Sequence, residues 1–237
     1  MVDRSAVEQS VREAAEGDPA CLPRRLCEAI KESVSMEAGT LSLFTDTPHR
    51  QLLCATSDAA LRLEKLQFGV GEGPCVTAAR TGDKVVVGDL HKEMTGWPVF
   101  GSCAQEQLRD VGAIYAFPLR LDARRTLGAV DVLCRDPLDP DPDVVQAGVI
   151  AARAASQALV HSYQETVDQG GLPMWEPEDI MDSYWGPTHA AVGVLVVQLD
   201  ISAEEALTRM RARAFGTGRS LPDIAEDILE NPDFLPT

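Results

Sequence analysis

The sequence has no apolar run of about eighteen residues, the length needed to span a membrane, and its first residues lack the basic-then-apolar pattern of a secretion signal. Positive charge is also scarce, because 21 lysines and arginines stand against 37 aspartates and glutamates among 237 residues. The resulting net charge of −16 argues against a protein that binds polyanions without specificity. We therefore expect a cytoplasmic protein with no membrane partner.

Residue spacings that bind metals or nucleotides are missing too. The six cysteines form no C-x-x-C pair and the four histidines form no H-x-x-x-H pair, so we expect no metal, no disulfide and no cofactor. The glycines at 69, 71 and 73 match neither G-x-G-x-x-G nor the P-loop pattern, and no serine lies in a G-x-S-x-G turn. These absences argue against an enzyme.

Residues 1–171 predict an α+β domain. Apolar periodicity predicts helices at 4–16 and 19–35, and alternating or β-branched runs predict strands at 40–44, 51–56, 85–87, 113–121 and 127–134. Further helices are expected at 76–80, from Pro98 to about Arg109, and at 144–163. Because hairpins replace regular strand–helix–strand repeats, we expect an antiparallel sheet flanked by helices, with a core over about 19–163 and an end at Gly170-Gly171.

Residues 172–237 predict a second, all-α domain of three short helices. The first covers about 177–199 and is expected to be interrupted at Gly186-Pro187, because proline lacks an N–H and clashes with the preceding turn. A buried strand is the alternative for the β-branched residues 192–197.

The second predicted helix begins at Ser202, which forms a capping box with Glu205. The third helix has apolar residues on one side, at Leu221, Ile224, Ala225 and Ile228. Three amphipathic helices of this length predict a small bundle.

Four arginines supply all the positive charge of residues 172–237, against twelve acids: Arg209, Arg211, Arg213 and Arg219. A focused basic patch on an acidic body favours a specific anionic partner, and RNA is one. Phe215 lies beside them and either stacks on a base or packs in the core. Two alternatives stay open, namely ion pairs within the bundle and double-stranded DNA read by a helix-turn-helix.

Cys75 follows Pro74 at a predicted helix N-terminus, where unpaired N–H groups lower a thiol pKa. It is therefore a candidate for ligand or redox sensing. The alternative is a packed thiol in a buried turn.

Several segments resemble known regulatory domains. Gly71-Glu72-Gly73-Pro74-Cys75, with the motifs at 85–90, 97–98 and 116–120, resembles the actinobacterial branch of the GAF sensor domains over about 19–163. The segments 190–195 and 202–207, Met210-Arg211-x-x-Ala214 and Arg219-x-Leu221-x-x-Ile224-Ala225 resemble an ANTAR domain over about 177–230. In this order the two domains resemble the GAF-ANTAR transcription antitermination regulators, which gives a GAF-like sensor at 1–171 and an ANTAR-like domain at 172–237.

The resemblance implies a homodimer whose GAF domain binds a small-molecule ligand and whose ANTAR domain binds hairpins in nascent RNA and prevents termination. Arg211 and Arg219 match basic positions of the family pattern, whereas Arg209 and Arg213 are added on charge alone. Ala191 and Gly193 match small positions where helices pack closely. Two rival functions remain: a protein-interaction module that has lost RNA binding, and a GAF-type thiol reductase that uses Cys75.

Overall fold

The computed structural model describes residues 3–44, 50–92, 96–171, 175 and 179–231, with only the backbone at 179–184. Its N-terminal domain is built on a five-stranded sheet in the order β2-β1-β5-β4-β3, and the paired strands are antiparallel. The strands are β1 (Ala38–Phe44), β2 (Arg50–Ala55), β3 (Val85–Val87), β4 (Ala113–Arg120) and β5 (Thr126–Cys134). The predicted α+β fold with an antiparallel sheet is confirmed.

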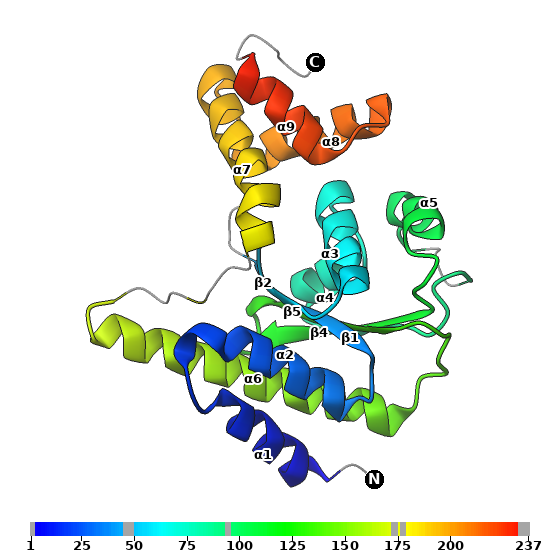
Figure 1. Ribbon diagram of the computed structural model, residues 1–237, viewed down its shortest axis with the longest axis vertical. Coiled ribbons are helices and arrows are strands. Elements are labelled where there is room, and N and C mark those ends of the chain that lie inside the picture. Colours follow the sequence, from blue (N-terminus) through cyan, green and yellow to red (C-terminus); the bar gives the residue numbers. More distant parts are fainter. Residues whose placement is uncertain (1–2, 45–49, 93–95, 172–174, 176–178, 232–237) are drawn as a thin grey trace.

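Helices cover both faces of the sheet (Figure 1). One face packs against α2 (Leu22–Ser33, after a 3-10 turn at Pro19–Cys21) and α6 (Pro142–Asp168), and α1 (Arg4–Ala15) packs on the outer side of these two helices. The other packs against α3 (Asp58–Val70), α4 (Pro74–Thr81) and α5 (Pro98–Gln107). Because β4 is covered on both sides, it reads as a nearly continuous apolar run and is buried from Ala113 to Leu119.

Helix α3 is absent from the elements predicted above, although the sequence carries its two end signals. The Ser57 hydroxyl accepts a hydrogen bond from the Ala60 N–H at 3.1 Å, as an N-cap does. Gly71 ends the helix in the left-handed region, with φ of 75°. Its apolar residues face both the sheet and the second domain, so one-sided periodicity is weak.

The second domain consists of α7 (Asp179–Leu199), α8 (Ala203–Thr217) and α9 (Leu221–Glu230). Its core takes apolar residues from all three helices, including Ala191, Val192, Leu195, Ala206, Leu207, Met210, Ala214, Leu221, Ile224, Ala225 and Ile228. The predicted helical bundle is confirmed, and residues 192–197 are helical rather than extended. Residues 177–178 of the first predicted helix lie outside the described part.

Two local predictions in this domain were wrong. Helix α7 continues through Pro187 instead of breaking there. Gly186 precedes the proline and has no Cβ, so it avoids part of the clash that a proline ring makes with the residue before it. Ser202 caps α8 by accepting from the Glu205 N–H at 3.1 Å, but the reciprocal bond of a capping box is described at Ser220 and Asp223, at the start of α9.

Among the helices formed by the described residues, none combines the length and the apolar character that crossing a bilayer requires.

The contact between α6 and the sheet leaves no room for a side chain at Gly148. A methyl group there would lie 2.2 Å from the ring of Phe117, so Gly148→Ala is expected to lower the free energy of unfolding by about 1–3 kcal/mol. Gly69→Ala, on α3 with no atom within 4 Å of the new methyl, is the control and should raise it by roughly 0.5–1 kcal/mol. Urea denaturation of both variants measures the difference, and equal effects would contradict this packing.

Candidate functional site

Six polar side chains meet between the sheet and helices α3 and α4, and we call them the polar cluster: Ser42, Arg50, Glu64, Gln67, Cys75 and Asp131. Strand alternation turns Ser42 and Asp131 toward α3, while their neighbours Leu41 and Val130 pack on the opposite face. Arg50 is 4% exposed and the other five are fully buried. Buried polar groups in such number need partners.

Arg50 supplies the positive charge of the polar cluster. Its Nη2 donates to Glu64 Oε2 at 2.5 Å and to Cys75 Sγ at 3.0 Å, and its guanidinium carbon lies 4.6 Å from the centre of the Phe44 ring. The Ser42 hydroxyl donates to the second oxygen of Glu64 at 2.7 Å. A carboxylate that is buried this deeply is tolerated because both of its oxygens are bonded.

Gln67 joins the two halves of the polar cluster. Its Nε2 donates to Asp131 Oδ2 at 2.5 Å, and its Oε1 accepts from the Cys75 N–H at 2.8 Å. A Cβ on Gly73 would lie 2.7 Å from that Oε1, so the position requires glycine. The amide of Gln67 therefore sets the start of α4 and the place of Cys75.

Some polar atoms beside these bonds have no hydrogen-bond partner among the described residues, and they are buried: Arg50 Nε, Arg50 Nη1 and Thr40 Oγ1. Thr40 pairs across the sheet with Asp131. Two N–H donors on a cation and one hydroxyl suit a ligand that offers acceptor oxygens.

Burial dominates the acid–base properties of the polar cluster. It raises the pKa of Asp131 to about 7, with the negative charge of Glu64 adding to the effect. It also raises the pKa of Glu64 in spite of the nearby Arg50, and it raises the pKa of the Cys75 thiol well above its ordinary value. The thiol therefore stays protonated at neutral pH.

The surroundings of Cys75 bear on both interpretations of this residue. The α4 N–H group at Cys75 bonds Gln67 rather than the thiol, and burial outweighs the attraction of Arg50. The polar cluster contains no second cysteine among the described residues, and the buried Cys27 and Cys54 belong to the core on the other face of the sheet. Disulfide exchange at Cys75 would thus have no neighbouring thiol there.

Three members of the polar cluster could also be considered as metal ligands. One ligand atom each from Glu64, Cys75 and Asp131 lies within 4.8 Å of the others. However, the guanidinium of Arg50 already contacts Glu64 and Cys75 and repels a second cation. The arrangement favours a polar organic ligand over a metal ion.

The structure does not place the four predicted RNA-binding arginines in equivalent surroundings. Arg209 donates to Glu205 Oε1 at 2.6 Å, and Arg219 donates to both oxygens of Asp227 at 2.5 and 3.1 Å. The pKa of Asp227 is lowered by the hydrogen bond from Arg219, and the charges of Arg219 and Arg213 contribute further. These arginines therefore lie beside acids on the bundle surface.

Arg211 lies against the GAF-like half of the chain instead. Its Nε and Nη2 donate to the backbone carbonyl of Phe68, at 3.1 and 2.7 Å. This contact joins α8 to α3 across 143 residues of sequence, and nothing in the spacing of the arginines indicates it.

The remaining predicted residues of the second domain differ in how far they are buried. Ala191 is fully buried in the core, as close helix packing implies, whereas Gly193 is on the exposed side of α7, and a methyl group added there would have no atom within 4 Å. Phe215 is 69% exposed, so it does not pack in the core.

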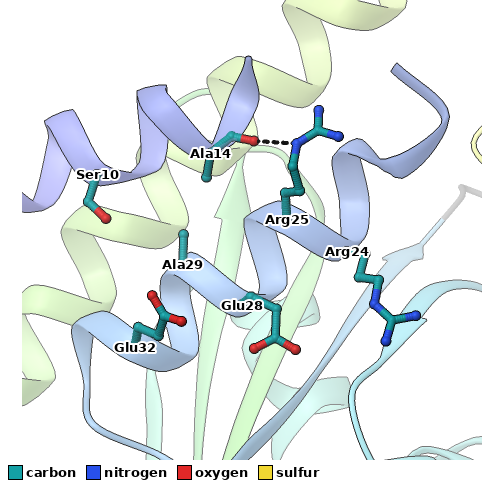
Figure 2. Close-up of a pocket in the computed structure, with 7 residues that line it drawn as sticks. All are labelled: Ser10, Ala14, Arg24, Arg25, Glu28, Ala29 and Glu32. Atoms are coloured by element: carbon teal, nitrogen blue, oxygen red, sulfur yellow. Dashed lines mark hydrogen bonds between the residues drawn. The ribbon is translucent and has the colours of Figure 1, made fainter. Parts of the chain in front are cut away.

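A surface groove of about 370 Å³ lies between α1 and α2 (Figure 2). Its lining includes charges of both signs, Arg24 and Arg25 against Glu28 and Glu32. Arg25 Nε donates to the Ala14 carbonyl at 2.8 Å and so ties the two helices together. The groove and the polar cluster lie on opposite sides of the sheet.

The raised pKa of Asp131 predicts a pH dependence of stability. The folded protein keeps this proton up to about pH 7, whereas an unfolded aspartate releases it near pH 4, so stability falls as pH rises toward 7. Relative to Asp131→Asn, the wild type should lose roughly 1.4 kcal/mol per pH unit at most from pH 5.5 to 7, and little beyond. Urea denaturation at each pH measures the difference, and parallel curves for the two proteins would refute it.

Comparison with known proteins identifies both halves of the chain. A family model of the GAF domain matches residues 20–160, and a model of the ANTAR domain matches residues 188–229. A search of curated proteins gives no match.

Solved structures resemble the N-terminal half. The GAF domain of a phosphoenolpyruvate-protein phosphotransferase from Acinetobacter is 11% identical, covers 69% of this chain and 97% of its own, and has a TM-score of 0.50. The corresponding domain from Coxiella burnetii is 13% identical, with 70% and 97% covered and a TM-score of 0.50. At this identity the likeness shows the fold. The chain belongs to the GAF-domain family and carries an ANTAR domain after it, which is the arrangement of a GAF-ANTAR regulator.

Proposed function

We propose that this protein is a cytoplasmic, signal-responsive transcription antiterminator. Its GAF domain takes up a small molecule at the polar cluster, and its ANTAR domain binds hairpins in nascent RNA and keeps the transcript out of its terminator form. The ordered pair of GAF and ANTAR domains in one chain is the observation that carries this proposal. No covalent chemistry is required.

The surface of the ANTAR domain supports an RNA partner. Phe215 offers an exposed ring on which an unpaired base can stack. Arg209 and Arg219 are half-exposed and pair with acids, and exposed pairs of this kind contribute about 0–1 kcal/mol. A phosphate therefore replaces the carboxylate at little cost, while the surrounding acids repel other polyanions.

The polar cluster supports a ligand of matching chemistry. The unpartnered Arg50 N–H groups and the Thr40 hydroxyl suit a carboxylate or carbonyl oxygen, and Asp131 suits a donor group. Since these side chains are buried, uptake requires α3 or α4 to move.

The exposed side of α7 supports a homodimer. Residues 185–199 contain no lysine, arginine, aspartate or glutamate, and their outward side carries Ala190, Gly193 and the 84% exposed Val197. An uncharged stripe with small residues lets a second copy of the helix approach closely.

RNA binding is tested with the two ion-paired arginines. UV crosslinking of cellular RNA to the purified protein, followed by sequencing, identifies the RNA for the assay. We expect it to be enriched in paired hairpins ahead of terminators. Arg209→Ala with Arg219→Ala should weaken binding of that RNA, and the plot of log affinity against log salt should become shallower by roughly 0.7 for each lost phosphate contact. Filter binding over a salt series measures both quantities.

The matched control is Arg4→Ala with Arg12→Ala, because these arginines of α1 are exposed and also pair with an acid, Glu8. This control should leave affinity and salt dependence unchanged. Equal loss in both double variants would indicate a general charge effect, and absence of any RNA binding would favour the rival function as a protein-interaction module.

The proposed dimer contact is tested at Val197. Val197→Asp places a charge in the apolar face and should convert dimer to monomer at micromolar concentration, as read by analytical ultracentrifugation. Gln198→Asp adds the same charge to the next exposed position and should leave the dimer intact. A dimer that survives Val197→Asp would place the contact elsewhere.

A further inference from the structure

Phe68, at the end of α3, packs its side chain into the ANTAR domain. Its side chain is 1% exposed and belongs to the ANTAR core. The ring lies 5.1 Å from the ring of Trp185 and 6.1 Å from that of His189, both on α7. On a further side the guanidinium carbon of Arg211 lies 5.7 Å from the ring centre. The Phe68 ring of the GAF domain is thus surrounded by two aromatic rings of α7 and by the Arg211 guanidinium of α8.

The backbone of Phe68 makes the second part of this contact. In the last turn of a helix the final carbonyls have no partner within the helix, and the Phe68 carbonyl is one of them. Arg211 donates two hydrogen bonds to it, so α8 caps α3 with a positive charge at the negative end of the helix dipole. A Cβ on Gly71 would lie 2.7 Å from Arg211 Nη1, so glycine leaves the space that the guanidinium occupies.

This contact holds Arg211 at an electrostatic cost. Burial lowers its pKa to about 10, with the positive charges of Arg50 and Arg80 adding to the effect. Within the described part of the chain, Arg211 pairs with a carbonyl and with no carboxylate. A phosphate would give the same guanidinium a bidentate partner of opposite charge in place of a neutral carbonyl. Docking on α3 is therefore open to competition from an RNA phosphate.

Helix α3 also reaches the polar cluster. Glu64 and Gln67 point into the cluster, and Phe68 is the next residue along the chain. Figure 1 shows α8 lying over α3, and the two helices are in contact. A ligand that shifts α3 to enter the cluster also shifts the ring and carbonyl that hold α8.

Resting on the function proposed above, we propose that α3 competes with RNA for Arg211. The Phe68–Arg211 contact masks this part of the ANTAR surface until the contact opens. In the docked state Arg211 is withdrawn from RNA. Opening the contact makes Arg211 available to RNA in addition to Arg209 and Arg219. The ligand at the polar cluster controls RNA binding through the fraction of molecules that are docked.

The test weakens docking without touching an arginine. In the full chain, Phe68→Ala and Trp185→Ala remove the two sides of the aromatic contact, and each should raise affinity for the crosslinked RNA by roughly tenfold, within the usual range of coupling between sites. Because both substitutions remove the same contact, the double variant should bind the RNA little more tightly than either single variant. Phe68→Leu keeps most of the apolar volume and is the control. It should give a smaller gain in RNA affinity.

Hydrogen exchange supplies a readout that does not depend on the variants folding well. In the wild type, RNA should increase amide exchange at the end of α3, near residues 66–71, because binding releases the Arg211 cap. Unchanged exchange there, together with equal RNA affinity in wild type, Phe68→Ala and Trp185→Ala, would overturn the masking proposal and leave the RNA-binding function standing. If none of these proteins binds the RNA, the proposed function itself fails.

Discussion

The buried ion pair between Arg50 and Glu64 fixes where α3 lies, and the positions of the polar cluster and the ANTAR domain follow from it. Both charges are almost completely removed from water, so losing either partner would leave an uncompensated charge and cost several kcal/mol. Glu64 therefore holds α3 against β1 and β2. Four residues later α3 presents Phe68 to α7 and α8, where it joins the second hydrophobic core.

Helix α3 contacts both domains. Its inner side satisfies polar groups of the sheet through Glu64 and Gln67, and its outer side contributes Phe68 to the ANTAR core. The outer contact joins the Phe68 ring and carbonyl to Arg211, a cation that has no carboxylate partner among the described residues. A helix that lines the polar cluster on one side and contacts the ANTAR domain on the other is placed to pass a signal between the two domains.

Particular elements show how far the sequence predicts the fold. The strands, the helices α1, α2, α4, α5 and α6, and the three ANTAR helices follow from periodicity and end signals that act locally. Helix α3 was missed because its apolar residues serve two partners, and α7 runs through Pro187 because packing of the surrounding core outweighs a local cost. The sequence did not single out Arg50, Glu64, Gln67 and Asp131 of the polar cluster, because they lie far apart in the chain and only the sheet register and α3 bring them together.

The sequence by itself determined the two domains, their order, and the residues that carry scarce chemistry, including Cys75 and the arginines 209, 211, 213 and 219. These properties depend on local composition and spacing. The tertiary structure alone decided which partner each side chain meets: Cys75 lies beside Arg50 in a buried cluster, and Arg211 faces Phe68 instead of solvent. The physical reason is that burial and charge pairing depend on contacts between residues that are distant in the chain, and no local pattern encodes them.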